Sequence, residues 1–304
     1  MHQIPVNCYV CGSSNDREFL QLVRRANDGS GGNYRVAQCR DCGFLFINPR
    51  PTPDGLLELY AKHIAYFRDD YEPLAREMPV LTRVLGDIRQ FVSTGSILEV
   101  GCGRGELLEI ARQAGFQVFG CDLQPSPSLD PRIPVHLGDL ESSALLPHSF
   151  DCIVMRNTLE HLFDPRKELQ MCGRLLKPGG FLYLKVPNGA YEHGWRCRLM
   201  LGKPHVFGPP WHLNYFTQDT LSRLLIQNGF EVADWLIESP TPDPSVVRNV
   251  FQQTAVAAFR AARFLTRGAM FPKPLLTTIA RKLPVPHVAE QNSSFAMHTA
   301  SGKA

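Results

Sequence analysis

Two pairs of closely spaced cysteines could bind a metal ion. The pairs are Cys8-x-x-Cys11 and Cys39-x-x-Cys42, and a glycine follows the second cysteine of each pair. Glycine permits the tight turn that aims two thiolates at one ion, and two such turns supply four sulfur ligands. Four thiolates suit structural zinc and leave no open position for catalysis. The paired spacing therefore predicts a structural zinc site and disfavours four separate buried or redox-active cysteines.

A glycine-rich sequence, GCGRG from Gly101 to Gly105, could hold an organic ligand. It lies between an apolar strand pattern and a helix pattern. Glycines let the backbone approach a ligand closely, and the helix N-terminus supplies free N–H groups. The dinucleotide fingerprint G-x-G-x-x-G is not matched, because position 106 is glutamate. Glu99, just before the loop, favours a ligand that lacks phosphates and carries an ammonium group.

Two aspartates follow the next two strand patterns along the chain. Asp122 ends the sequence VFGCD, and Asp139 lies in HLGDL. A carboxylate in the first position can accept hydrogen bonds from both hydroxyls of a ribose. One in the second position could accept a hydrogen bond from an adenine amino group. Taken singly, Asp122 could be a helix cap and Asp139 a turn residue, but the ordered series with Glu99 and the glycine loop favours ligand binding.

Alternating strand and helix patterns from residue 96 onward would position these side chains. Strands are expected at 96–100, 116–121, 133–137, 150–155, 180–186 and 230–237. Helices are expected at about 104–114, 164–177 and 217–228, the last with Thr217 as its N-cap. Residues 293–300 could complete the sheet. The alternation predicts an α/β fold with a doubly wound, mostly parallel, seven-stranded sheet.

The residues before 96 divide into two expected parts. Residues 1–50 read as a zinc ribbon, with short strands at 16–25 and 33–40 around a glycine-rich loop. Residues 44–53 would end it as a proline-rich connector. Residues 51–95 read as a helical connector with a helix starting near Pro79, and residues 66–73 as a mobile gate to the cofactor. The main domain would span 96–304.

The composition limits the class of protein. The chain has 304 residues, 44% of them hydrophobic and 20% charged, which excludes a disordered or collagen-like chain. A formal net charge of +3 is too small for a protein bound mainly by phosphate backbones. No long apolar run indicates a transmembrane helix, and the N-terminus lacks a secretory signal pattern. We therefore expect a cytoplasmic protein with reduced cysteines.

From residue 96 to about 237 the sequence resembles the class I S-adenosylmethionine (SAM)-dependent methyltransferases. The resemblance is carried by EVGCGRG, FGCD, GD, FDCIVMRNTLEHLFDP and LLKPGGFLYLKVPN. The sequences CRDCGFLFINPRP and WHLNYFTQDTLSRLLIQNGFEV are similar to a bacterial subgroup with an N-terminal four-cysteine zinc-binding region. The similarity therefore extends over most of the chain.

The resemblance implies a Rossmann-like sheet with SAM at the carboxyl ends of its strands, and structural Zn²⁺ at the four cysteines. It assigns SAM binding to Glu99, Gly101, Cys102, Gly103, Gly105, Asp122, Leu123, Asp139, Leu140 and Asn157. His161 lies where the family places residues beside the reactive end of the cofactor, so it is the candidate catalytic base. The alternative for His161 is a residue that packs or caps a helix.

Residues 187–216 form a long connection, which is typical of a lid or binding loop. Its aromatic and histidine side chains could bind an acceptor, and the candidates are Tyr191, His193, Trp211, His212 and Tyr215. For each of these the alternative is packing of the lid against the sheet. Residues 244–289 hold several Arg and Lys and no acid, and read as a basic helical insertion. That insertion could contact an anionic membrane surface, its own domain or a second subunit in a homodimer.

These patterns predict a SAM-dependent methyltransferase acting on an O or C atom of a small-molecule acceptor. The resemblance points to a sugar, a glycan precursor or a secondary-metabolite intermediate. No nucleic-acid partner is expected. Two alternatives are open: an RNA methyltransferase that grips RNA with the ribbon, and a non-catalytic SAM-binding scaffold protein.

Overall fold

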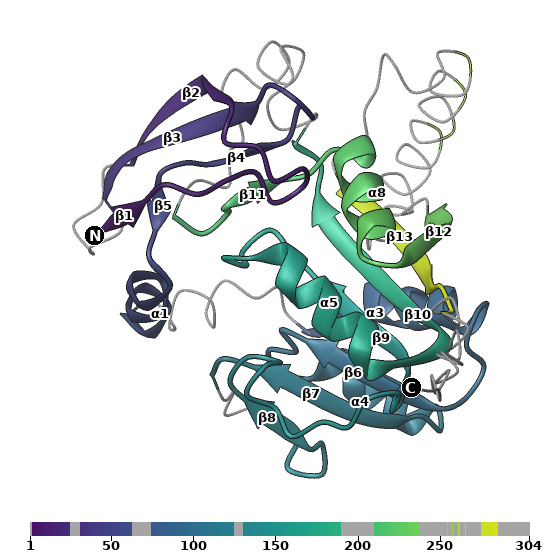
Figure 1. Ribbon diagram of the computed structural model, residues 1–304. Coiled ribbons are helices and arrows are strands. Elements are labelled where there is room, and N and C mark those ends of the chain that lie inside the picture. The colour runs from purple at the N-terminus through teal and green to yellow at the C-terminus, as the bar shows by residue number, and fades with distance from the viewer. Residues whose placement is uncertain are drawn as a thin grey trace, which may run out of the picture.

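The computed structural model describes residues 2–24, 31–62, 74–124, 130–189, 210–236 and 275–284, and the separate positions 254, 257, 261 and 265. Within these residues the strands form sheets of seven, four and two strands. Figure 1 shows the seven-stranded sheet, here called the main sheet, and the four-stranded sheet, here called the N-terminal sheet, as separate sheets; the chain runs from β11 of the N-terminal sheet directly into α8.

The main sheet has the strand order β12-β13-β10-β9-β6-β7-β8. Its strands are β6 (Ser96–Val100), β7 (Gln117–Asp122), β8 (Val135–Leu137), β9 (Phe150–Arg156), β10 (Leu176–Pro187), β12 (Phe230–Leu236) and β13 (Leu275–Lys282). The neighbouring strands β8, β7, β6, β9 and β10 pair in parallel. By contrast, β13 pairs antiparallel with both β10 and β12. The predicted doubly wound, mostly parallel, seven-stranded α/β sheet is confirmed.

Helices cover both faces of this sheet, so its central strands carry apolar side chains on both sides. The helices are α3 (Leu74–Arg89), α4 (Glu106–Gln113), α5 (Pro165–Leu175) and α8 (Gln218–Gln227). On β6, Leu98 and Val100 pack with α5 and α8, whereas Ile97 packs with α3 and α4. Figure 1 shows these two helix pairs on opposite faces. The short, mainly apolar strands β6 and β9 are of the kind that the sequence predicted.

Local signals fix the starts of two of these helices. The side chain of Asp164 accepts hydrogen bonds from the N–H groups of Arg166 and Lys167, and Pro165 takes the first helical position of α5. At α8, Thr217 and Thr220 form a reciprocal capping box, which confirms the predicted N-cap. By contrast, the N-cap of α4 is Gly105, which has a φ of 72° and no side chain to cap the helix. The N–H groups of its first turn are thus left for another acceptor.

The N-terminal sheet has the order β11-β4-β3-β2. It contains β2 (Asp16–Arg24), β3 (Gly32–Cys39), β4 (Leu45–Ile47) and β11 (Asn214–Tyr215), and β1 (Gln3–Ile4) pairs separately with β5 (Arg50–Pro51). The predicted pair of ribbon strands is therefore present. The proline-rich connector is a correction, because residues 45–47 and 50–51 are strands and α1 (Pro53–Lys62) follows directly. β11 comes from the predicted lid, so the lid ends inside the ribbon's own sheet.

Two further expectations differ from the structure, and others fall on residues that it does not describe. The seventh strand is β13, which lies inside the predicted basic helical insertion; residues 293–300, proposed for that place, lie outside the described residues. Pro79 lies inside α3 and not at its start, since the helix begins at Leu74. The proposed gate at 66–73 and most of 244–274 lie outside the described residues. None of the helices that the structure describes is long and apolar enough to cross a bilayer.

Candidate functional site

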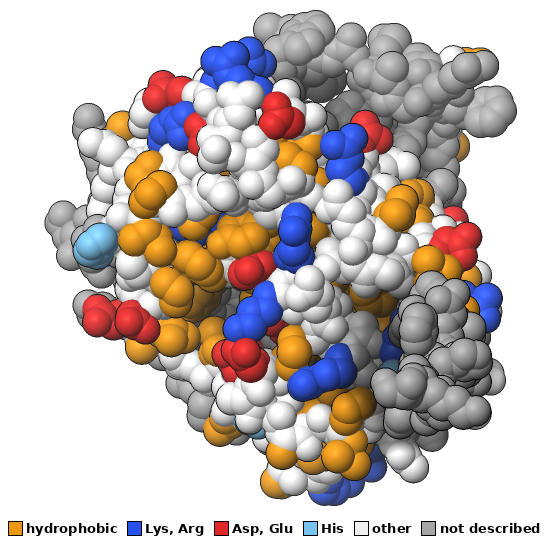
Figure 2. All heavy atoms as spheres, in the orientation of Figure 1, with side chains coloured by type: hydrophobic (Ala, Val, Ile, Leu, Met, Phe, Trp, Pro, Cys, Tyr) orange, Lys and Arg blue, Asp and Glu red, His pale blue; other side chains and the backbone are white. Residues whose placement is uncertain are grey.

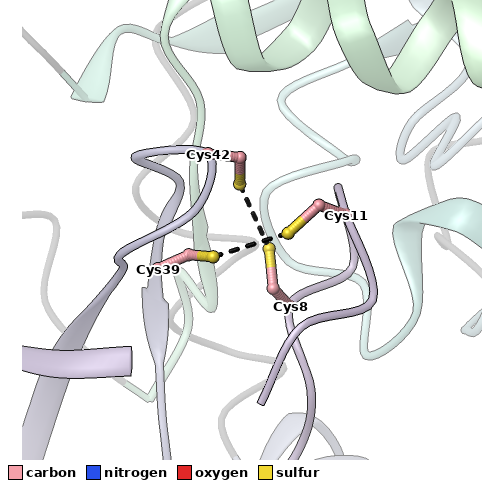
Figure 3. A group of neighbouring side chains, drawn as sticks. All are labelled: Cys8, Cys11, Cys39 and Cys42. Atoms are coloured by element: carbon pink, nitrogen blue, oxygen red, sulfur yellow. Dashed lines mark hydrogen bonds between the residues drawn. The ribbon is translucent and has the colours of Figure 1, made fainter. Parts of the chain in front are cut away.

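The four paired cysteines converge from two loops. Figure 3 shows their sulfur atoms facing one another, with the Sγ atoms of Cys8 and Cys42, and of Cys11 and Cys39, both 3.5 Å apart. All four sulfurs lie within 4.8 Å of one another. In a tetrahedral zinc–thiolate site with bonds of about 2.3 Å, the sulfurs are about 3.8 Å apart. The donor set and its spacing therefore fit the predicted Zn²⁺ ion.

Each cysteine pair is held by a turn that ends in glycine. Gly12 donates its N–H to the Cys8 carbonyl at 2.7 Å, and Gly43 donates to the Cys39 carbonyl at 2.9 Å. Both glycines have a backbone φ near 80°, a conformation that residues with a side chain rarely adopt. Burial raises the pKa of the Cys8 thiol, so a cation is needed to stabilise its thiolate. The glycine that follows each Cys-x-x-Cys pair in the sequence therefore closes the turn that carries the two cysteines.

The zinc turn is docked on the main domain. Arg166 of α5 donates to the carbonyls of Tyr9 and Val10, between Cys8 and Cys11, at 3.0 and 3.1 Å. Cys8 and Cys39 belong to the same hydrophobic cluster as α5 and α8. The N-terminal module is therefore packed against the main sheet's helices.

The glycine loop lies at the carboxyl end of β6. Gly101 has a φ of 73°, and a Cβ atom there would lie 2.5 Å from Oγ1 of Thr158. Its N–H donates to the Cys121 carbonyl at 2.8 Å. The side chain of Cys102 is buried against Gly120 of β7, so only its backbone belongs to the loop. Arg104 forms an ion pair with Glu106 and does not disturb the turn.

Asp122 fixes the loop as well as ending β7. One carboxylate oxygen accepts the N–H of Gly103 at 2.8 Å, and the other accepts the N–H of Gln124 at 3.2 Å. Each oxygen keeps a further lone pair for a ligand hydroxyl. The sequence predicted a ligand role for Asp122, and this positioning role is an addition.

A cavity of about 410 Å³ opens at this edge of the sheet. Small-molecule sites commonly enclose about 300–1,000 Å³. Figure 2 shows hydrophobic side chains gathered around the hollow, on the side of the molecule where α1 lies. The cavity brings together these predicted site residues: Gly101, Gly103, Asp122, Leu123, Asp139, Leu140, Asn157 and His161.

Two of these residues have distinctive surroundings. Asp139 accepts a hydrogen bond from the N–H of Ser142 at 2.8 Å, and its bonds with Ser142 lower the pKa of its carboxyl group. Asn157 follows β9 with a φ of 51° and donates its N–H to the Lys185 carbonyl at 2.8 Å. Asparagine tolerates this left-handed conformation better than most residues. The carboxylate and the amide therefore reach the cavity on well-defined turns.

Glu99 lies on β6, two residues before Gly101, and pairs with a residue of the neighbouring strand β9. It is fully buried, and its carboxylate receives hydrogen bonds from Arg156 at 3.1 Å. Burial raises the pKa of Glu99 to about 7, against the opposing effect of Arg156. It is not part of the described cavity lining. The structure therefore places Glu99 in an ion pair between β6 and β9, which supports the glycine loop from within the sheet.

His161 lies in the turn that follows β9, on the cavity wall. Its Nδ1 donates to the Trp211 carbonyl at 2.9 Å, because a carbonyl can only accept. The proton is therefore on Nδ1, and Nε2 has a lone pair. Burial lowers the pKa of His161 to about 4, so the ring is neutral at physiological pH.

A cluster missed by the sequence analysis surrounds His161. Glu160 and His212 are buried, and one ligand atom from each of the three residues lies within 4.8 Å of the others. The rings of His161 and His212 meet edge to face with centroids 4.7 Å apart. Tyr60 of α1 lines the cavity, and its ring lies 5.3 Å from that of Trp211. The sequence indicated members of this cluster one at a time and gave no sign that they lie together.

The remaining lid candidates do not all reach the cavity. Trp211 and His212 contact cavity-lining residues, as described above. Tyr215 is a correction: it is 1% exposed and packs in the core beneath the N-terminal sheet with Tyr34 and Leu56. Tyr191 and His193 lie outside the described residues.

Arg50 connects the N-terminal module to the His161 turn. It is fully buried, and it donates to the Phe163 carbonyl at 2.7 Å and to the side chain of Asn214 at 3.4 Å. Asn214 in turn donates to the Leu162 carbonyl at 2.7 Å. The guanidinium also lies over the Tyr9 ring, 4.9 Å from its centroid. This arginine, which the sequence did not single out, holds the turn and β11 at a fixed spacing.

Comparison with known proteins agrees with this geometry. Residues 71–234 match a family described as a methyltransferase domain. The chain is 30% identical over 180 residues to the ubiquinone biosynthesis O-methyltransferase of Proteus mirabilis, covering 56% of this chain and 70% of that protein. It is 29% identical to a probable SAM-dependent methyltransferase of Mycolicibacterium smegmatis, covering 46% of this chain and about half, 53%, of that relative's length.

Solved structures share the fold at lower identity. One is the 1,6-didemethyltoxoflavin-N1-methyltransferase of Burkholderia thailandensis, which is 15% identical with a TM-score of 0.52 and covers 87% of this chain and 99% of that chain. Another is the [4+2]-cyclase SpnF, 19% identical with a TM-score of 0.50, covering 78% of this chain and 98% of that one. The match to the family over residues 71–234, together with these relatives, shows that the chain belongs to the methyltransferase-domain family and is a class I SAM-dependent methyltransferase.

Proposed function

We propose that this protein transfers the methyl group of SAM to a hydroxyl oxygen of a small, largely apolar acceptor. The observation that carries the proposal is the shared cavity. Asp122, the glycine loop and His161 all line it. Residues for cofactor and acceptor thus meet in one space, as methyl transfer requires.

The cofactor would lie along the carboxyl ends of β6, β7 and β8. Asp122 would accept hydrogen bonds from the ribose hydroxyls, and Asp139 would lie beside the adenine, between Leu123 and Leu140. Gly101 and Gly103 would bring the backbone close to the methionine part. SAM supplies an electrophilic methyl group on a sulfonium, and the chain need form no covalent intermediate with it.

The described acceptor side of the cavity favours an apolar, planar molecule. It is lined by Leu56, Leu57, Tyr60, Leu162 and Phe163. Such walls bury aromatic rings well, whereas a free sugar needs more hydrogen-bonding partners. A phenolic hydroxyl is therefore preferred to a sugar hydroxyl. The O-methyltransferase relative supports an oxygen acceptor.

His161 is proposed as the catalytic residue that promotes loss of the acceptor's proton. Its Nε2 lone pair is fixed in place by the bond from Nδ1 to Trp211. As the hydroxyl oxygen attacks the methyl carbon, the carbon–sulfur bond breaks with its electrons on sulfur. The hydroxyl proton must leave, and a positioned acceptor for it contributes about 10²–10⁴-fold to the rate.

The test is methyl transfer from labelled SAM to a panel of phenols and sugars, followed by mass spectrometry of the products. The wild-type protein should methylate phenols, and His161→Ala should lower kcat by about 10²–10⁴-fold while S-adenosylhomocysteine binding persists. Binding of cofactor without transfer to any acceptor would favour the scaffold alternative. Transfer to RNA alone would favour the RNA methyltransferase and refute the proposal.

A further inference from the structure

His161 and two buried neighbours bring together donor atoms that could bind a metal ion, in a cluster distinct from the four cysteines. Glu160, His161 and His212 offer a carboxylate oxygen and two imidazole nitrogens within 4.8 Å of one another. Nε2 of His161 lies 3.8 Å from Oε1 of Glu160. In a tetrahedral site with bonds of about 2.1 Å, neighbouring ligand atoms are about 3.4 Å apart. Small side-chain movements would therefore close the set on one ion.

The orientation of the His161 ring matches that of a metal ligand. Metal-binding histidines usually donate their second ring N–H to a carboxylate or a backbone carbonyl, which fixes the tautomer. Nδ1 of His161 donates to the Trp211 carbonyl at 2.9 Å in this way. Nε2, which faces Glu160, is then the nitrogen with a lone pair. The same bond joins the two chain segments that carry the ligands, because Trp211 precedes His212.

Backbone hydrogen bonds hold those two segments together. The carbonyl of Glu160 accepts the N–H groups of Leu213 and Asn214 at 2.9 and 3.1 Å. The spacing of Glu160 and His212 is thus set by the fold and does not depend on the ion. Such preorganisation is what a specific metal site needs.

We infer that Glu160, His161 and His212 bind a divalent transition-metal ion beside the acceptor end of the cavity. Two imidazoles and one carboxylate suit Zn²⁺, Fe²⁺, Mn²⁺ or Co²⁺. Three protein ligands leave at least one position open for water or for an acceptor oxygen. The inference rests on the proposed function for its chemical role and changes one step of it. With Nε2 of His161 bound to the ion, that lone pair would no longer accept the acceptor's proton; the ion would instead lower the pKa of an acceptor hydroxyl at its open position, and the proton would pass to solvent.

The experiment counts metal ions on the full-length protein. The chain is stripped with a chelator, reloaded separately with each of the four ions, and weighed by native mass spectrometry with and without S-adenosylhomocysteine. The wild type should hold two ions per chain. His212→Asn should hold one, and Glu160→Gln should bind the second ion at least about tenfold more weakly. His148→Asn is the matched control, because asparagine tolerates its φ of 59° and this residue lies outside both clusters.

Cobalt spectra identify which site each ion occupies. Thiolate-to-cobalt charge-transfer bands come from the cysteine site alone, so His212→Asn should keep them, together with the visible bands of that site, and lose only the absorption of the second cobalt ion. Wild-type protein that never holds more than one ion, or a second ion kept by both His212→Asn and Glu160→Gln, would overturn the inference. Two ions without S-adenosylhomocysteine binding would instead overturn the proposed function, so the two failures are distinguishable.

Discussion

Replacing Gly101 with alanine should separate the loop's role in binding from its role in folding. Gly101 has a φ of 73°, and the new Cβ would lie 2.5 Å from Oγ1 of Thr158. The left-handed backbone costs alanine about 1–2 kcal/mol. The contact is far shorter than an ordinary van der Waals distance, so the loop or Thr158 must move. Thr158 donates to the Val100 carbonyl at 3.1 Å, and its movement would therefore disturb the end of β6 as well.

Gly229 provides a matched control for this substitution. It has a φ of 81°, lies after α8, and has no atom within 4 Å of an added Cβ. Gly229→Ala should lose about 1–2 kcal/mol in the free energy of unfolding, measured by urea denaturation, and Gly101→Ala should lose more because of its contact with Thr158. Only Gly101→Ala should bind S-adenosylhomocysteine at least about tenfold more weakly by calorimetry, a change of about 1.4 kcal/mol. Equal affinities in the two variants would refute the assigned role of the loop.

Three further predictions concern the zinc turn, the buried arginine and an acid in the cavity. Cys39→Ser should lose the ribbon zinc and unfold at a lower temperature. A chelator should lower the midpoint temperature of the wild type by more than that of the variant, which keeps only the ion proposed for Glu160, His161 and His212; equal shifts would contradict a structural role of the ribbon zinc. Arg50→Lys should weaken the contacts with Phe163 and Asn214 and so lower the free energy of unfolding by about 3 kcal/mol. It should also reduce kcat more than cofactor affinity. An effect on cofactor affinity alone would contradict this role of Arg50. Burial raises the pKa of Glu168 to about 7, so its contribution to stability is complete below about pH 4.5 and is lost as the pH rises through 7. Glu168→Gln should remove up to about 3 kcal/mol of the difference in unfolding free energy between pH 5 and pH 8, and an unchanged difference would contradict the raised pKa.

The parts of the fold that were predicted correctly are those encoded by short local patterns. The strand β6, the glycine loop and the cap of α8 each depend on a few adjacent residues. β13 was missed because it reads LLTTIARK, with two threonines and two basic residues. It is a strand because it pairs on both sides, with β10 and β12. Tertiary pairing of this kind overrides local preference.

In the functional site, too, residues with a local sequence signal were predicted and residues that depend on distant contacts were missed. The convergence of the four cysteines and the place of Asp122 beside the glycine loop were predicted because their spacing is local. The contact of Glu160 with β11 joins residues far apart in sequence, and no periodicity encodes it. Tyr215 was assigned wrongly because aromatic residues in a lid and in a sheet core look alike in sequence. Arg50 was missed because a buried arginine is recognised only from its partners.

The most direct test of the central claim is native mass spectrometry of the full-length protein with excess S-adenosylhomocysteine. The wild type and Gly229→Ala should each gain the mass of one cofactor molecule per chain. Gly101→Arg should gain none, because its side chain would enter the cavity at the loop. Failure of the wild type to bind either SAM or its demethylated product, or full binding by Gly101→Arg, would contradict the account.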